Sequence, residues 1–247
     1  MRKAIILGTQ RSGTSYLREW INQVPAVEFY TEVFLPKNKE YSSFKRYIMS
    51  SSISYNIFSL FNIEKLPKVS DNPITNKIIN NYLKKLFYAE NFPKNSFKGQ
   101  NIPRDTRNID LIGFKSMYSQ TKKNKPLLKY IIKNELKVIH IYRSNILDII
   151  VSRELKKITG IPHSFNNEQV IKNKQVYIDC KTLLKKMGSI KKSVLFWDNI
   201  FDSDNYLKIS FEGFLSDKEV RKSVLSFLNL PEQYYDQKIK MIKTNQQ

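Results

Sequence analysis

The segment Ile5–Leu17 constrains the fold most, because an apolar run leads there into a glycine-bounded loop and then into the start of a helix. Gly8 and Gly13, two of only seven glycines in the chain, frame this loop. Glycine lets successive backbone N–H groups converge on an oxyanion, and the N-terminus of a helix also favours negative charge. The segment therefore predicts a strand, a phosphate-binding loop and a helix. The alternative is a plain strand-to-helix turn with a helix cap.

The spacing Gly8-x-x-x-x-Gly13-Thr14-Ser15 matches a P-loop at every position but one. Thr14 stands where nucleoside triphosphatases have a lysine, so the loop lacks the charge that reaches the β- and γ-phosphates of ATP or GTP. Arg11 places a guanidinium inside the loop instead. This difference favours another phosphate pattern. A nucleotide kinase stays as an alternative, although it would need the missing lysine.

Two separate segments carry a resemblance to a known family. Gly8–Leu17 resembles the G-x-x-R-S-G-T-[ST]-x-L loop of sulfotransferases that use 3′-phosphoadenosine-5′-phosphosulfate (PAPS). Lys137–Leu147, followed by Val151-Ser152 and Thr159-Gly160, resembles the R-x-N-x-L, V-S and T-G pattern of the bacterial carbohydrate-type branch. Shorter segments similar to the family's G-F-K-x-M-x-x-Q strand and Y-E-x-L segment are Gly113–Gln120 and Ser210–Leu215. The resemblance implies a P-loop-like α/β fold with a central parallel β-sheet flanked by helices.

The resemblance also implies a donor site that binds PAPS and releases 3′-phosphoadenosine 5′-phosphate (PAP), without a metal. Arg143 and Ser152 would bind the 3′-phosphate, and Arg11 would also stabilise the leaving phosphate. The alternative is that Arg143 is an exposed charge at a strand end and Ser152 a hydroxyl on a helix face. The residues implied for the 5′-phosphosulfate loop are Arg11, Ser12, Gly13, Thr14, Ser15 and Tyr16.

Glu32 is our candidate for the base that accepts the proton of the acceptor hydroxyl. It follows the second predicted strand, at the carboxyl edge where ligands bind in such sheets, and it resembles the glutamate at this place in carbohydrate and tyrosylprotein sulfotransferases. Glu28 on the same strand is the rival, and Glu32 could instead only pair with Arg11. Lys115 is a further acid–base candidate. His140 is expected to form a hydrogen bond in the core, and His163 could face the active site.

Length and hydropathy predict one α/β domain over residues 1–247. The region 37–107 matches no segment of the family, and we expect it to form a helical insertion that binds the acceptor or covers the site. Its aromatic residues are expected to be core residues, with pocket lining as the alternative. They are Phe58, Phe61, Tyr82, Phe87, Tyr88, Phe92 and Phe97.

The single cysteine, Cys180, fits a reducing compartment, and no apolar run resembles a membrane span or signal peptide, so we expect a cytoplasmic protein.

The net charge of +20, from 42 basic and 22 acidic residues, attracts anions. PAPS, an acidic glycan or lipid, a membrane surface and nucleic acid are all candidates, and scattered lysine pairs also fit a compositional bias. A non-enzymatic protein that binds polyanions is therefore an alternative function, although no specific nucleic-acid motif is present. We expect the acceptor to be a hydroxyl-bearing small molecule, glycan or lipid, with carbohydrate or glycolipid favoured by the resemblance. Oligomeric state is not predicted. The basic residues expected near the 3′-phosphate from charge alone are Lys238, Lys240 and Lys243.

Hydrophobic periodicity alternates between short strands and longer helical segments, as expected for a parallel sheet with crossover helices. The expected strands are 3–7, 26–30, 113–117, 138–142 and 207–210. The expected helices are 13–23, 126–134, 145–157, 169–187 and 217–227.

Overall fold

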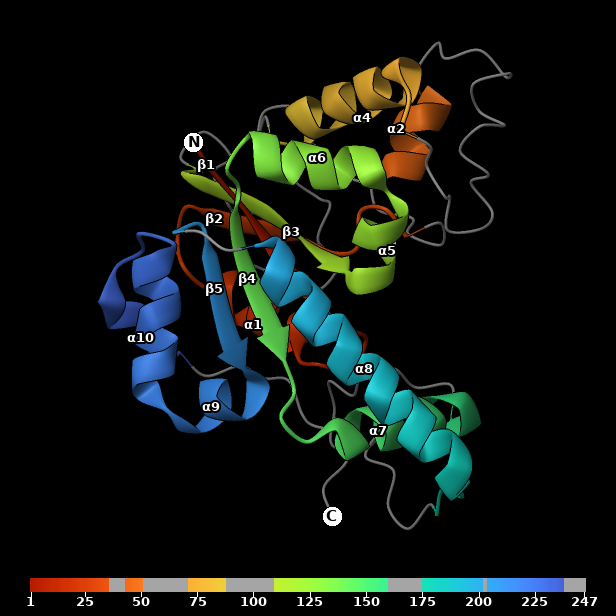
Figure 1. The fold of residues 1–247 in the computed structure, drawn as a ribbon. Coiled ribbons are helices and arrows are strands. Elements are labelled where there is room, and N and C mark those ends of the chain that lie inside the picture. The colour runs from red at the N-terminus through yellow and green to blue at the C-terminus, as the bar shows by residue number, and fades with distance from the viewer. Residues whose placement is uncertain (36–42, 51–70, 88–108, 160–174, 202–203, 238–247) are drawn as a thin grey trace. The chain divides into compact units, whose positions relative to one another are not determined.

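The computed structural model describes residues 1–35, 43–50, 71–87, 109–159, 175–201 and 204–237 (Figure 1). Its described strands form one sheet in the order β2-β3-β1-β4-β5, so the chain has the predicted α/β fold with a parallel central sheet. These strands are β1 (Arg2–Gly8), β2 (Val27–Tyr30), β3 (Leu111–Met117), β4 (Lys137–Tyr142) and β5 (Tyr206–Ser210). All five predicted strands are confirmed, each within two residues of its expected start.

Helices alternate with these strands along the chain, as the periodicity predicts (Figure 1). The helices before β4 are α1 (Thr14–Ile21), α2 (Phe44–Ser50), α4 (Pro73–Leu86), α5 (Tyr118–Lys123) and α6 (Lys125–Lys133). The helices after β4 are α7 (Ile146–Thr159), α8 (Cys180–Ile200), α9 (Phe211–Ser216), α10 (Lys218–Phe227) and the 3₁₀ turn η4 (Glu232–Tyr234). No helix in the described part of the chain is long and apolar enough to cross a membrane.

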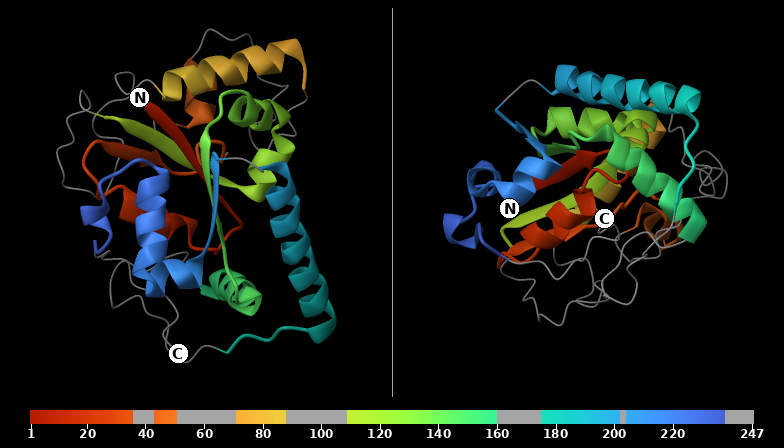
Figure 2. Two further views of the ribbon diagram at one scale, coloured as in Figure 1. Left: turned by 60° about the vertical axis from the view of Figure 1, so that its left-hand side comes forward. Right: turned by 90° about the horizontal axis from the view of Figure 1, so that it is seen from below.

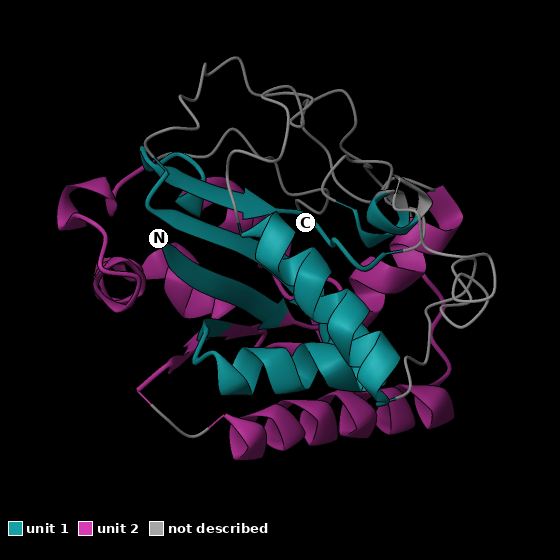
Figure 3. Ribbon diagram, turned by 90° about the horizontal axis from the view of Figure 1, so that it is seen from above, with its two compact units in different colours: residues 1–7, 21–139 teal, residues 8–20, 140–247 magenta. Residues whose placement is uncertain are grey.

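The described chain divides into two compact units, drawn in different colours in Figure 3. Unit 1 comprises Met1–Leu7 and Ile21–Ile139, and unit 2 comprises Gly8–Trp20 and His140–Gln247. The predicted phosphate loop therefore belongs to unit 2, together with α7, α8 and the segments that follow them.

The core of unit 1 includes the buried strands β2 and β3. They pair in parallel from Val27 opposite Leu111 to Tyr30 opposite Phe114. Asn72 begins α4 because its side chain accepts the N–H of Thr75 and completes a capping box. One face of α4 is buried. Of the aromatic residues predicted in the insertion, Tyr82 and Phe87 belong to this core, and the other five lie outside the described residues. Within the predicted insertion, α2 and α4 are the described helices.

In unit 2, α7 and α8 pack through Ile149, Ile150 and Ile190. After β5, the chain passes into the blue helices α9 and α10 (Figure 2). Helix α8 differs from the prediction for residues 169–187. It begins at Cys180 because the Asp179 side chain caps it, and it continues to Ile200 because apolar residues such as Trp197 extend its buried face. Residues 175–179 are not helical, and residues 160–174 lie outside the description.

Candidate functional site

The loop between β1 and α1 has an unusual backbone. Arg11 has a φ of 73° and Gly13 a φ of 94°, in the left-handed region that only glycine adopts without penalty. The backbone N–H and the hydroxyl of Ser12 both donate to the carbonyl of Thr9, at 3.2 and 2.8 Å. A Cβ on Gly13 would lie 2.1 Å from the Phe211 ring. The loop is thus a compact turn whose shape requires glycine at position 13.

Gly8 is needed for a different reason, since its conformation is ordinary but its surroundings are tight. A Cβ there would lie 2.6 Å from both the Ser12 hydroxyl oxygen and the Thr14 methyl carbon. Ser12 and Thr14 are themselves buried. Both glycines that frame the predicted loop therefore permit close packing of the chain, which is how a backbone cradle for an oxyanion is built.

Arg11, the charged residue of the loop, turns toward α7. Its Nε donates to the Ser152 hydroxyl oxygen at 2.6 Å, so two residues predicted for the donor site lie in contact. Burial lowers the pKa of Arg11, and the neighbouring charge of Arg143 lowers it further. Arg11, Arg143 and Ser152 are therefore gathered in one part of unit 2.

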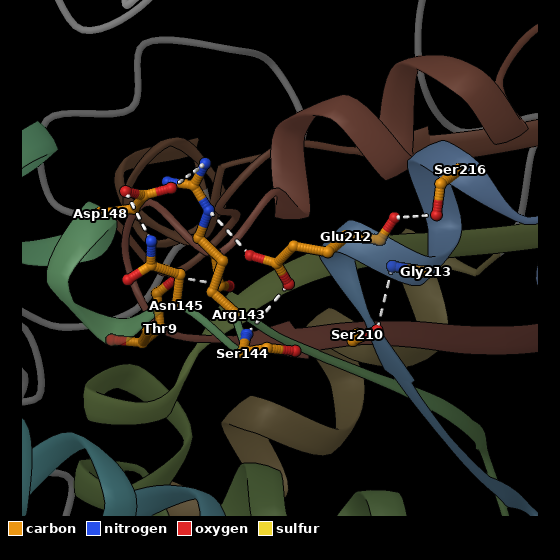
Figure 4. Close-up of polar contacts among 10 residues, drawn as sticks. Thr9, Arg143, Ser144, Asn145, Asp148, Ser210, Glu212, Gly213 and Ser216 are labelled. Carbon is orange, nitrogen blue, oxygen red and sulfur yellow. Dashed lines mark hydrogen bonds and ion pairs between the residues drawn. The ribbon is translucent and has the colours of Figure 1, made fainter.

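Arg143 follows β4, and Figure 4 shows the carboxylates of Asp148 and Glu212 beside it. Its Nη2 lies 3.3 Å from Asp148 Oδ2, its Nε lies 3.6 Å from Glu212 Oε1, and its guanidinium carbon lies 5.2 Å from the centre of the Phe211 ring. The described contacts of Arg143 do not include the Ser152 hydroxyl. The predicted pair is thus gathered in one region, but Ser152 bonds to Arg11 rather than to Arg143.

Glu212 also fixes the backbone after β4, because its Oε2 accepts the N–H of Ser144 at 2.9 Å (Figure 4). The helix that carries it, α9, is capped by Ser210, whose hydroxyl oxygen accepts the N–H of Gly213 at 3.1 Å. Helix α9 was not predicted as a separate helix, although its segment was identified by resemblance. Its start places Glu212 and Phe211 beside Arg143.

Tyr16, predicted to contact the donor, packs edge-to-face with Phe211 and Phe214 at ring-centre distances of 5.8 and 6.3 Å. Burial raises the pKa of its hydroxyl, while the charge of Arg221 acts in the opposite direction. The described contacts of Tyr16 are thus those of a packing residue at the start of α1. Ser15 is partly exposed on the same turn.

Arg153 is a further residue of this region that sequence reasoning missed. Its Nη2 donates to the Thr9 hydroxyl at 2.6 Å and lies 3.3 Å from the carbonyl oxygen of Gln10. Burial lowers the pKa of its guanidinium. The only signal in the sequence was its place directly after Ser152, which no motif marked.

Glu32 belongs to unit 1, two residues beyond the end of β2, and other unit 1 residues hold its carboxylate. Lys115 on β3 lies 3.2 Å from Oε1, and the amide of Gln120 on α5 donates to Oε2 at 2.8 Å. Gln120 is fixed in turn, because its Oε1 accepts the N–H of Met117 at 3.0 Å. Glu32 remains partly exposed.

The rival Glu28 has a different environment. Its residue is only 6% exposed, and its carboxylate forms a hydrogen bond with Tyr30. Burial, and secondarily this carboxylate, raise the pKa of Tyr30. Glu28 is thereby committed to the interior of unit 1, and Glu32 is the more accessible of the two acids.

Of the two histidines, the structure describes only His140. His140 is fully buried and lies against Tyr206 and Asp198, so the predicted core role is confirmed. Burial lowers its pKa to about 4, opposed by Asp198. Gly160, His163, Lys238, Lys240 and Lys243 lie outside the described residues. Within the described ranges, no group of three acidic, histidine or cysteine side chains could hold a metal ion.

Comparisons with known proteins agree with the motifs. Matches among solved structures include a sulfotransferase domain from the curacin biosynthetic pathway, 15% identical over 98% of this chain and 80% of that chain, with a TM-score of 0.46. Another is a sulfotransferase from Alicyclobacillus acidocaldarius, 14% identical over 97% of this chain and 86% of that chain, with a TM-score of 0.48. No curated protein sequence matches significantly. The model of the sulfotransferase domain matches residues 1–246, so this chain belongs to the sulfotransferase family and is a transferase of sulfuryl groups.

Proposed function

We propose that this sulfotransferase uses PAPS as its donor. The observation that carries the proposal is the 2.6 Å hydrogen bond from Arg11 Nε to the Ser152 hydroxyl, which joins the loop after β1 to the helix that follows Arg143. An arginine in each of these two segments suits a ligand with two separate anionic groups, because each guanidinium can bind one of them. PAPS has a phosphosulfate at the 5′ position and a phosphate at the 3′ position.

In this scheme, the loop amides and Arg11 hold the 5′-phosphosulfate, and Arg143 binds the 3′-phosphate. Ser152 orients Arg11 through the 2.6 Å hydrogen bond. Its hydroxyl also assists Arg143 in binding the 3′-phosphate. Arg143 suits a phosphate because its planar fork donates two parallel hydrogen bonds. Thr14 in place of the P-loop lysine disfavours a nucleotide kinase.

The reaction is an in-line displacement at sulfur. The acceptor oxygen forms a bond to sulfur while the bond from sulfur to the 5′-phosphate oxygen breaks, so that PAP leaves with the electron pair. We assign Glu32 as the base that takes the hydroxyl proton, because Lys115 and Gln120 fix both of its oxygens while the side chain stays partly exposed. Arg11 stabilises the negative charge that develops on the leaving phosphate.

The acceptor is, in our proposal, a hydroxyl of a carbohydrate or glycolipid, with residues 37–107 as its binding region. The carbohydrate-type pattern after β4 supports this choice. The cytoplasm is the proposed compartment, since the only cysteine of the chain, Cys180, is free and exposed.

The proposal is tested by measuring PAP release from PAPS with a panel of sugars, glycolipids and simple alcohols. Glu32→Gln should lower kcat by roughly 10³-fold, as expected for loss of a general base, and change the affinity for PAP less than twofold. Glu28→Gln is the matched control, and it should retain more activity. PAP release from no acceptor, together with binding of polyanions and not of PAP, would favour the non-enzymatic alternative.

A further inference from the structure

The loop of residues 9–12 adopts a conformation that its own sequence does not favour. Arg11 has a long side chain, yet its φ of 73° lies in the left-handed region, which is unfavourable for residues other than glycine. Within the loop, the backbone N–H and hydroxyl of Ser12 bond to the Thr9 carbonyl. These local bonds tighten the turn, but they do not reach Gln10 or the Arg11 side chain. Support for those residues comes from α7.

Two adjacent residues of α7 hold three adjacent residues of the loop. Ser152 accepts a hydrogen bond from Arg11 Nε at 2.6 Å. Arg153 donates from Nη2 to the Thr9 hydroxyl at 2.6 Å and approaches the Gln10 carbonyl at 3.3 Å. Because α7 is a 14-residue helix packed on α8, it provides a firm base for these contacts.

Arg153 differs from Arg143 in what neutralises it. Arg143 faces two carboxylates, whereas Arg153 forms no ion pair with a carboxylate in the described part of the chain. Its Nε is buried and has no hydrogen-bond partner among the described residues. Burying a guanidinium against neutral oxygens alone is unfavourable, so stability gives little reason for its presence. A bound anion nearby would offset its charge.

We propose that Arg153 is a positioning residue for the donor loop. By holding Thr9 and Gln10, it keeps Arg11 and the loop amides preformed for the phosphosulfate end of the donor, and its charge adds to the attraction for that end. This inference rests on the proposed function. It concerns the 5′ end of the nucleotide only, so it assigns Arg153 no part in selecting the 3′-phosphate.

The test is calorimetric binding of PAP and of ADP, which lacks the 3′-phosphate. Arg153→Ala should weaken both nucleotides by on the order of tenfold, as expected for hydrogen bonds from a charged group, and leave the ratio of the two affinities unchanged. Arg153→Lys should recover part of the loss. Thr9→Val removes only the accepting hydroxyl and should show a smaller loss, on the order of threefold, that is not additive with Arg153→Ala.

Arg221→Ala is a matched control, since Arg221 also donates from Nε and Nη1 to carbonyl oxygens in unit 2, those of Tyr235, Phe214 and Leu215. It should lower Tm without the equal loss of PAP and ADP binding. Wild-type affinity in Arg153→Ala, or a loss no greater than in Arg221→Ala, would overturn the inference. So would a loss confined to PAP.

Hydrogen exchange of the ligand-free protein separates this inference from the proposed function. Arg153→Ala should speed exchange at the amides of residues 9–12 by roughly tenfold, whereas Arg221→Ala should leave them unchanged. Failure of wild type to bind either nucleotide would refute the proposed function, while unchanged exchange in Arg153→Ala would refute the positioning role.

Discussion

The loop after β1 and the segment after β4 both place an arginine in the same part of unit 2, but they hold it differently. Arg11 sits in a left-handed turn and bonds to a neutral hydroxyl, that of Ser152. Arg143 lies between the carboxylates of Asp148 and Glu212 (Figure 4), and its guanidinium also lies over the ring of Phe211. The backbone conformation of the loop and a hydrogen bond to a neutral group position Arg11, whereas ion pairs position Arg143.

This difference has a consequence for ligand binding. In the proposed function, a phosphate that approaches Arg11 meets a guanidinium whose Nε bonds to a neutral hydroxyl, so no carboxylate has to be displaced from that nitrogen. A phosphate that approaches Arg143 must compete with Asp148 and Glu212. If the proposed donor site is correct, we expect Arg11 to contribute mainly to affinity and Arg143 mainly to selectivity, since only a strongly charged group in the right place would displace carboxylates.

The largest effect is expected from breaking the shape of the first loop. Gly13→Ala places a Cβ 2.1 Å from the Phe211 ring at a φ of 94°, so unfolding free energy should fall by about 3–4 kcal/mol and binding of PAP and ADP should both be lost. Gly188→Ala is the control, because a Cβ there meets nothing within 4 Å in the middle of α8. It should raise stability by roughly 0.5–1 kcal/mol in chemical denaturation. Equal changes in unfolding free energy in the two variants would contradict a loop whose conformation requires glycine at position 13.

A smaller effect is expected from acid, acting on β4, the strand directly before Arg143. Burial lowers the pKa of His140 from 6.5 to about 4, so the unfolded chain binds the proton first and stability is lost as pH falls from 6.5 to 4. The loss should be about 3 kcal/mol. Asp198 acts below this window: burial raises its pKa, but bonds from Lys208 and Tyr206 outweigh this and bring it below 3.8.

Denaturant titrations between pH 7 and pH 4 would measure how the unfolding free energy changes with pH. His140→Asn should abolish this change, since the titrating ring is removed while a polar group remains. If the pH dependence of stability persists in this variant, another group titrates. The stability of β4 and the segment after it would then not depend on His140.

The smallest effect is expected from removing one charge beside Arg143. Asp148→Asn should raise the affinity for PAP by up to about fivefold at low salt, because an ion pair whose carboxylate is exposed contributes no more than about 1 kcal/mol. ADP binding should not change, and the gain should shrink as salt rises. Glu135→Gln, an equal charge change in unit 1, is the control. A weaker affinity in Asp148→Asn would show that the carboxylate positions Arg143 rather than competing for it.

The sequence predicted the strands and the loop well, because local patterns determine both. The run 138–142 is apolar except for His140, and its strand is buried along most of its length. The spacing of Gly8 and Gly13 predicted a tight loop, and the close approaches at both glycines explain why. Helix α8 was misplaced because its start depends on one cap, Asp179, and its length on buried contacts near Trp197 that periodicity alone does not reveal.

The partners of the charged residues could not be predicted, since they come from segments distant in sequence. Arg153 and Thr9 are 144 positions apart, and Ser144 and Glu212 are 68 apart. The pairing of Glu32 with Lys115 and Gln120 likewise depends on how β2, β3 and α5 pack in unit 1. Motifs identified most of the chemical groups, but only the fold shows which group holds which.

The most direct measurement is the calorimetric affinity of wild type, Arg143→Ala and Arg11→Ala for PAP, ADP and adenosine-2′,5′-bisphosphate. We predict that wild type prefers PAP, that Arg143→Ala loses this preference with roughly a 10–100-fold weaker affinity for PAP alone, and that Arg11→Ala weakens all three nucleotides. Equal or absent binding of the three nucleotides by wild type would contradict a site in which one arginine anchors the 5′ end and the other selects the 3′-phosphate.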